Sequence, residues 1–185
     1  MDRDLELRRL LPKDLPAAMA LSQSVGWNQV PADWLLFLEL GEGYGLFAPE
    51  DGLVATVCLM PYPPSLAWIS LLIVHQAWRR RGLGSALCSH ALRAAAGHGL
   101  TPLLDATPQG RPMYLRMGFR DLWAFQRWVR TGPAGQDDEA ATDVRPLEPG
   151  DLDAICALDA AAFGARRDAI LARLASRLPG GALVA

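Results

Sequence analysis

Apolar and polar positions in the first 130 residues predict a domain that mixes strands and helices. Residues 5–10, LELRRL, alternate apolar and charged side chains as a half-buried strand does. Residues 67–74, AWISLLIV, are apolar on both faces, which favours a strand in the middle of a sheet. The turn sequence PEDG at 49–52 separates two further apolar runs and predicts a hairpin.

Helices are predicted between these strands. Residues 31–40 begin on proline and stop before Gly41, as a helix with defined ends does. The other elements that we expect are helices at 13–25, 84–97 and 111–117, a short strand at 102–106, and a last strand within 119–129. The order of these elements indicates a mixed α/β sheet domain.

A second, incomplete copy of the opening sequence follows this domain. Residues 7–22 and 144–159 align without gaps and share eight of sixteen residues, and the same offset lays residues 45–48 over 182–185. Such self-similarity is typical of a repeated structural unit. The chain is therefore predicted to hold one complete unit and the opening of another.

The junction between the two copies has the composition of a linker. It is small, polar and acidic, and it contains Gly and Pro but no bulky apolar residue. We therefore expect a first domain at 1–131, a linker at 132–142 and a partial repeat at 143–185. A fragment of that size buries little apolar surface and leaves a sheet edge open, so it should dock on the first domain or form a homodimer, unless the 185 residues belong to a longer tandem protein.

Composition narrows the classes of function. The net charge of −2 argues against a general nucleic-acid binder, because no basic excess is present to neutralise phosphates. The longest apolar run, 66–74, is far shorter than the roughly 20 residues that cross a bilayer, and the charged start is not a signal peptide. We expect a cytoplasmic protein with no membrane partner. The three cysteines are widely spaced, which favours buried free thiols over a metal site.

The stretch AWRRRGLGSAL, residues 77–87, carries the most specific chemical signal. A central strand, a glycine loop and a helix start bring together backbone N–H groups that have no partner of their own. Gly82 and Gly84 would let the backbone approach a ligand and tolerate positive φ, and the three arginines would add charge-assisted hydrogen bonds. A pyrophosphate is the expected ligand of this loop. The dinucleotide fingerprint fails at Leu87, and no P-loop G-K-[ST] follows.

The remaining pattern, R-x-x-G-x-G within residues 71–87, and GRPMYLRMGF at 110–119 together resemble the two signature regions of the Gcn5-related N-acetyltransferase (GNAT) superfamily. In particular, the chain resembles tandem GNAT proteins. The resemblance implies a GNAT-like mixed, largely antiparallel sheet flanked by helices, and an acetyl-coenzyme A (acetyl-CoA) dependent N-acyltransferase. It implies pyrophosphate contacts from Arg79, Arg80, Arg81, Gly82, Leu83, Gly84 and Ser85. It also implies backbone contacts to the pantetheine arm from Leu72, Ile73 and Val74.

The resemblance also suggests catalytic groups. Tyr114 occupies the family position of the tyrosine that can protonate the leaving thiolate, although a core aromatic would fit there too. Many relatives have a glutamate on the strand at 67–74, which has no acidic residue here. Ser70 could position a water as the base instead. Asp105 is the other candidate, as base, as anchor for a substrate ammonium, or simply as a turn residue.

Substrate contacts in the family come largely from the loop between the first two helices. Trp27 and Asn28 in that loop, together with Tyr62, could form an aromatic wall with one polar contact. This favours a small, partly apolar or planar amine as the acceptor, and the resemblance implies that its primary amine attacks the acetyl group directly. The alternative is a non-catalytic acyl-CoA sensor whose second repeat mediates association.

Overall fold

The computed structural model describes residues 4–126, 128, 144–177 and 180–185. Its core is a five-stranded sheet in the order β1-β2-β3-β4-β5. The strands are β1 (Glu6–Arg9), β2 (Glu42–Ala48), β3 (Gly52–Tyr62), β4 (Leu66–Val74) and β5 (Thr101–Leu104). Every neighbouring pair is antiparallel except β4 and β5, which are parallel. The prediction of a mixed, largely antiparallel sheet flanked by helices is therefore confirmed.

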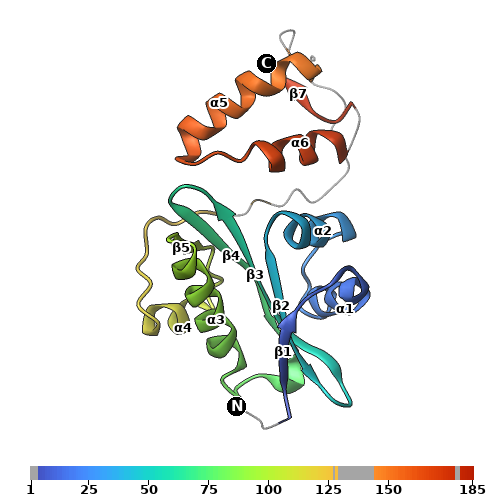
Figure 1. Ribbon diagram of the computed structural model, residues 1–185, viewed down its shortest axis with the longest axis vertical. Helices are drawn as coiled ribbons and strands as arrows, with labels where there is room; N and C mark the ends of the chain where they lie inside the picture. The colour runs from blue at the N-terminus through green and yellow to red at the C-terminus, as the bar shows by residue number, and fades with distance from the viewer. Residues whose placement is uncertain (1–3, 127, 129–143, 178–179) are drawn as a thin grey trace.

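Helices cover both faces of this sheet. The 3₁₀ turns and helices of the first domain are η1 (Pro12–Asp14), α1 (Leu15–Ser24), α2 (Pro31–Leu40), η2 (Gln76–Trp78), α3 (Leu83–Gly97) and α4 (Arg111–Arg116). Helices α1 and α2 lie on one side, and α3 and α4 on the other (Figure 1). The helix predicted at 31–40 matches α2 residue for residue.

The last strand predicted within 119–129 is wrong for the residues that the structure describes there, 119–126 and 128, none of which is in a strand. Its apolar side chains point largely into solvent, with Trp123 68% and Trp128 87% exposed. A strand needs a neighbour to satisfy its backbone, and among the described strands β5 has a partner on one side only. The apolar pattern alone could not supply that partner.

A bulge in β4 divides the core into two clusters. Two residues of β4, Leu71 and Leu72, lie opposite one position of β3, and Leu71 has φ +49°. The extra residue reverses which face the following side chains occupy. Ala67 and Ile69 therefore pack with the α3 residues, whereas Leu71 and Ile73 pack with α1 and α2 around the fully buried Trp34.

The second segment contains two helices and a small sheet. Its elements are β6 (Arg145–Pro146), η3 (Pro149–Asp151), α5 (Leu152–Phe163), α6 (Asp168–Arg177) and β7 (Leu183–Val184). The linker predicted at 132–142 lies outside the described residues, so the domain boundaries stay a prediction. The segment contacts the first domain through Phe163, whose ring centroid is 5.0 Å from that of Tyr62 and 5.9 Å from that of Trp68. Helix α6 also packs beside α2.

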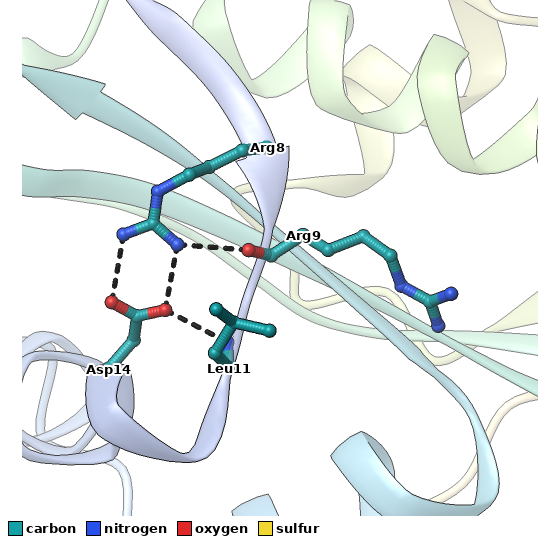
Figure 2. Close-up of polar contacts among 4 residues, drawn as sticks. All are labelled: Arg8, Arg9, Leu11 and Asp14. Atoms are coloured by element: carbon teal, nitrogen blue, oxygen red, sulfur yellow. Dashed lines mark hydrogen bonds and ion pairs between the residues drawn. The ribbon is translucent and has the colours of Figure 1, made fainter.

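The start of the first domain is fixed by a bidentate ion pair. Both terminal nitrogens of Arg8 donate to Asp14 at 2.8 Å, and the backbone N–H of Leu11 donates to the same carboxylate at 2.8 Å (Figure 2). The carboxylate is nearly buried. Hydrogen bonds from Arg8 hold the pKa of Asp14 below its ordinary value.

The same arrangement recurs 137 positions later. Arg145 donates to both oxygens of Asp151 at 2.6 Å, and the N–H of Glu148 donates to that carboxylate at 2.8 Å. Helix α6 likewise matches α2 position for position at this offset. The two segments thus share the ion pair that precedes the first helix and the bounds of the second helix, whereas α5 is two residues longer than α1 and β6 two residues shorter than β1.

The offset changes at the following strand. The N–H of Leu10 donates to Gly43 O at 2.8 Å, and the N–H of Leu147 donates to Ala182 O at 2.9 Å. The correspondence between β2 and β7 is therefore 139 positions, and the gapless match predicted for the last four residues is wrong by two. Two additional residues between α6 and β7 account for the shift.

No helix in the described part of the chain combines the length and apolar character needed to traverse a bilayer. Cys58, Cys88 and Cys156 are buried and unpaired, as predicted. Within the same residues, no cluster of three or more metal-ligating side chains is present.

Candidate functional site

The site begins where β4 and β5 separate. Their parallel pairing ends at Ile69 and Leu104, so Ser70 and Asp105 are the next residue on each strand. Paired strands lie about 4.8 Å apart, which puts these two sequence-predicted residues on either side of the fork. Beyond it, no described strand pairs with residues 70–74 on the β5 side. That edge of β4 can offer backbone hydrogen bonds to a ligand.

The bulge described above lies at the same point. Leu71 is held in its left-handed conformation by the buried Thr56 hydroxyl, which donates to Leu71 O at 2.8 Å. The sequence did not predict this feature. Its only trace is the loss of alternation at Leu71 and Leu72, which also fits an ordinary strand buried on both faces.

The start of α3 forms the second part of the site. Gly82 is its N-cap with φ +79°, and its carbonyl accepts the first helical bond, from Ala86 N at 3.0 Å. Within the described residues no acceptor is recorded for the N–H groups of Leu83, Gly84 and Ser85. Free first-turn amides and the positive end of the helix dipole make a binding site for anions.

The two glycines of the loop have different roles. Both were expected to tolerate positive φ, and it occurs at Gly82 but not at Gly84. A Cβ on Gly84 would make ordinary contacts, 3.5 Å from Met113 Sδ and 3.7 Å from Val74 Cγ2. The end of β4, the start of α3 and the start of α4 therefore meet around Gly84.

The three arginines are arranged differently from one another. Arg79 Nε donates to Val74 O at 3.1 Å, which ties the loop to the end of β4. The Arg81 guanidinium stacks on Trp78, 4.5 Å from the ring centroid. Arg80 is exposed and has φ +62°, an uncommon conformation for a residue with a side chain. The structure thus brings the predicted arginines to one loop beside the free amides.

Tyr114 lies on α4 and is partly buried. Its ring packs edge-on against Phe119 at 5.8 Å, beyond a helix end where Gly118 has φ +93°. Burial, and to a lesser degree the Cys88 thiol, raises the pKa of Tyr114 to about 12. The phenol therefore stays protonated at neutral pH and can donate a proton.

The predicted substrate residues are not all in one place. Trp27 packs against the cluster that contains Leu71, on the α1 and α2 side of the bulge, and Asn28 beside it is exposed. Tyr62 lies at the far end of β3 and packs on Phe163. Phe163 was not predicted as a neighbour, because the contact joins residues about 100 positions apart and leaves no local pattern.

Three kinds of comparison bear on this geometry. The model of the Acetyltransferase (GNAT) family matches residues 8–119. Among curated proteins, none matches the chain. Among solved structures, a Pyrococcus horikoshii protein assigned as an acetyltransferase has TM-score 0.74 at 21% identity over 96% of this chain. The present chain spans only 63% of that protein's length.

Other solved structures match about two thirds of this chain. A GCN5-related N-acetyltransferase from Ralstonia eutropha has TM-score 0.54 and 26% identity over 68% of this chain and 98% of its own. A glucosamine-6-phosphate N-acetyltransferase from Arabidopsis thaliana has TM-score 0.58 and 13% identity over 68% and 97%. The family match covers more than half of the chain and includes the fork, the glycine loop and α4. The chain therefore belongs to the Acetyltransferase (GNAT) family.

Proposed function

We propose that the chain transfers an acetyl group from acetyl-CoA to a primary amine of a small-molecule acceptor by direct attack. The observation that carries this proposal is the first turn of α3, where the N–H groups of Leu83, Gly84 and Ser85 find no partner among the described residues, beside the open edge of β4. Open space beside Gly82, where an added Cβ would meet no atom within 4 Å, supports binding of a diphosphate next to this row of N–H groups.

The proposed cofactor contacts follow from the same elements. Amides and guanidinium groups at 79–85 would hold the diphosphate, each hydrogen bond to a charged oxygen being worth about 1.5–3 kcal/mol. Leu72, Ile73 and Val74 would bind the pantetheine amides through their backbone, as a further strand would. The arm would then bring the thioester to the fork at Ser70 and Asp105.

In the reaction the amine must lose one proton and the leaving thiolate must gain one. The amine nitrogen attacks the thioester carbon, the new C–N bond forms, and the C–S bond breaks to release a thiolate. Tyr114 is the proposed acid for that thiolate. Burial raises the pKa of Tyr114, so the phenol carries its proton at neutral pH.

The proton lost by the amine is assigned to a base at the fork. Asp105 is exposed there and could take the proton directly or hold the substrate ammonium. Ser70 is half-buried and could position a water instead. One variant distinguishes the two assignments, because Asp105→Asn slows acetyl transfer only if the carboxylate takes part.

The acceptor is proposed to approach from the α1 and α2 side, where Trp27 and Asn28 lie near the bulge. An indole wall favours a small, planar or partly apolar amine. Tyr62 can take part only if the contact with Phe163 leaves one ring face accessible. A cytoplasmic location, without nucleic-acid or membrane partners, belongs to the same proposal.

One observation favours a second candidate, a non-catalytic acyl-CoA sensor. Strand β4 carries no acidic residue to serve as the base. Calorimetry and an acetyl-transfer assay on a panel of amines separate the two. The enzyme binds one coenzyme A per chain and acetylates at least one amine, and Tyr114→Phe slows transfer without weakening binding. Binding without transfer to any amine would favour the sensor, and no binding would contradict both.

A further inference from the structure

The last residue of α5, Phe163, reaches the sheet of the first domain at the hairpin of β3 and β4 (Figure 1). Its ring centroid lies 5.0 Å from that of Tyr62 and 5.9 Å from that of Trp68. Tyr62 and Trp68 lie outside the two core clusters of the described residues, and all three rings are half-buried. Tyr62, Trp68 and Phe163 thus form a separate aromatic group, to which the second segment contributes one ring.

This aromatic group lies on the same face of the sheet as Ser70. Side chains alternate along a strand, and Ala67 and Ile69 pack in the cluster that contains the α3 residues. Trp68 and Ser70 therefore lie on the opposite face, where Ser70 is paired with Cys58 of the α1 and α2 cluster. Two residues of a strand span about 7 Å, so the aromatic group begins within the length of a small molecule from the fork.

Ser70 also lies between aromatic side chains that come from both segments. Along β4 it stands between Trp68, which contacts Phe163, and Leu71, whose cluster includes Trp27. Phe163 ends the first helix of the second segment, and Trp27 follows the first helix of the first domain. An acceptor whose amine reaches the fork would therefore have an aromatic side chain on either side of it along the strand.

Phe163 is held in place by neighbours in its own segment. The Arg167 guanidinium lies over the ring, 3.9 Å from its centroid, and Arg167 Nε donates to Asp159 at 3.0 Å. The next residues fix the chain, because Gly164 caps α5 with φ +85° and Ala165 is buried. A ring fixed before binding loses little conformational entropy when a ligand contacts it. Since Asp159 compensates the charge of Arg167, the surface favours an apolar group over an anion.

We propose that Phe163 and Trp68 determine which acceptor is used, by binding an aromatic ring that a short chain joins to the reacting amine. This inference rests on the proposed function, because it places the amine at the fork. Aromatic rings pair favourably at centroid distances of about 4.5–7 Å, in edge-to-face or offset arrangements. Phenethylamine can bridge the distance of about 7 Å between Ser70 and Trp68, whereas ethylamine has no ring to reach the aromatic group.

The test compares the acetylation of phenethylamine and of ethylamine by the complete chain at saturating acetyl-CoA. The two amines share the reacting group, so kcat/KM should be at least about tenfold higher for phenethylamine because its ring is buried. Phe163→Leu keeps an apolar side chain but removes the ring, and the preference should fall about three- to tenfold, through KM rather than kcat. Phe163→Tyr keeps the ring and should retain the preference.

Two further variants control for the position of α5. Leu158 lies on the same helix and is 73% exposed, so Leu158→Ala should keep the preference for phenethylamine. Limited proteolysis of α5 and α6 should be as slow in Phe163→Leu as in the unmodified chain. If Phe163→Leu is cut faster, Trp68→Leu decides the test instead, because it removes the ring on β4 and leaves α5 unchanged. The preference should then fall in Trp68→Leu by a similar factor.

Calorimetric titration of phenethylamine into the coenzyme A complex distinguishes this inference from the proposed function. Acetylation of ethylamine without a preference for phenethylamine contradicts the inference and leaves the proposed function standing. A preference that survives in both leucine variants, or that is lost equally in Leu158→Ala, does the same. Binding of phenethylamine that Phe163→Leu weakens, without transfer to any amine, supports the aromatic group and contradicts the proposed function. Absence of both binding and acetylation of phenethylamine contradicts the inference.

Discussion

Replacing each loop glycine by alanine should have opposite effects on stability. Gly82 has φ +79°, where a residue with a Cβ is strained by roughly 1–2 kcal/mol. The same change lowers the conformational entropy of the unfolded chain, which offsets about 0.4–1 kcal/mol of this strain. Gly82→Ala should therefore lower the free energy of unfolding by about 1 kcal/mol.

Gly84→Ala should instead raise the free energy of unfolding. Gly84 is helical, and its new methyl would meet Met113 and Val74 at ordinary contact distances. Alanine is favoured over glycine in a helix by up to about 1 kcal/mol, and roughly half of that is expected in a first turn. At about 2–4 °C per kcal/mol for a chain of this size, the two variants should differ in Tm by roughly 3–6 °C.

Coenzyme A binding should separate the variants as well. If Gly82→Ala relaxes its backbone, the amides that follow turn away from the ligand. Loss of one hydrogen bond to a charged oxygen costs about 1.5–3 kcal/mol, or roughly tenfold to a hundredfold in Kd. Gly84→Ala should bind within about threefold of the unmodified chain, because its methyl points to protein side chains rather than across the amide row.

Calorimetric titration and thermal unfolding of both variants supply the measurements, with Gly97→Ala as the control. Gly97 ends the same helix, and a Cβ there would meet nothing within 4 Å, so binding should not change. Normal affinity in Gly82→Ala would refute the argument that the left-handed cap aims the amides. Equal loss of affinity in both loop variants would show that space at Gly84 matters instead.

Three further changes test other parts of the structure. Tyr114→Phe should slow acetyl transfer about 10²–10⁴-fold with unchanged coenzyme A affinity. It should also abolish the fall in stability that Tyr114 ionisation causes between about pH 10 and 12. Asp14→Ala should lower the free energy of unfolding by about 2 kcal/mol, because Arg8 and the Leu11 N–H lose their acceptor. In the unmodified chain, the stabilisation from this ion pair should disappear as the pH falls below about 4 and Asp14 is protonated. Phe163→Ala should accelerate limited proteolysis of α5 and α6 by removing its aromatic contacts.

Two of these changes have a matched control variant. Asp151→Ala removes the equivalent pair where both side chains are more exposed, and should cost less than Asp14→Ala. Leu158→Ala lies on the same helix as Phe163 but is 73% exposed, so proteolysis should not change. An alkaline transition that persists in Tyr114→Phe would assign that transition to another group.

Elements with strong local signals were predictable from sequence. Helix α2 follows from its proline start and glycine end, and β4 from apolar residues on both of its faces. The loop of Arg79 to Gly84 was found because its pattern is local. By contrast, Leu71 reveals its conformation only through the partner strand, since a bulge is a mismatch between two strands rather than a property of one.

Contacts between segments far apart in the chain could not be predicted from the sequence for the same reason. The ring contact of Phe163 with Tyr62 depends on how α5 docks, which no spacing encodes. The register of β7 was misjudged because two additional residues lie between it and α6, and a gapless alignment cannot detect them. The apolar run at 119–128 matched a strand pattern but has no described neighbour to pair with.

The bulge in β4 also has a consequence for cooperativity. Because the strand gives Ala67 and Ile69 to one cluster and Leu71 and Ile73 to the other, neither cluster can melt while the other keeps its complete packing. The first domain should therefore unfold in a single transition, and the amides of β4 should be among the slowest to exchange with solvent deuterium. The open edge of β4, where the pantetheine arm is proposed to bind, would then belong to a slowly exchanging strand, which favours a fixed thioester position.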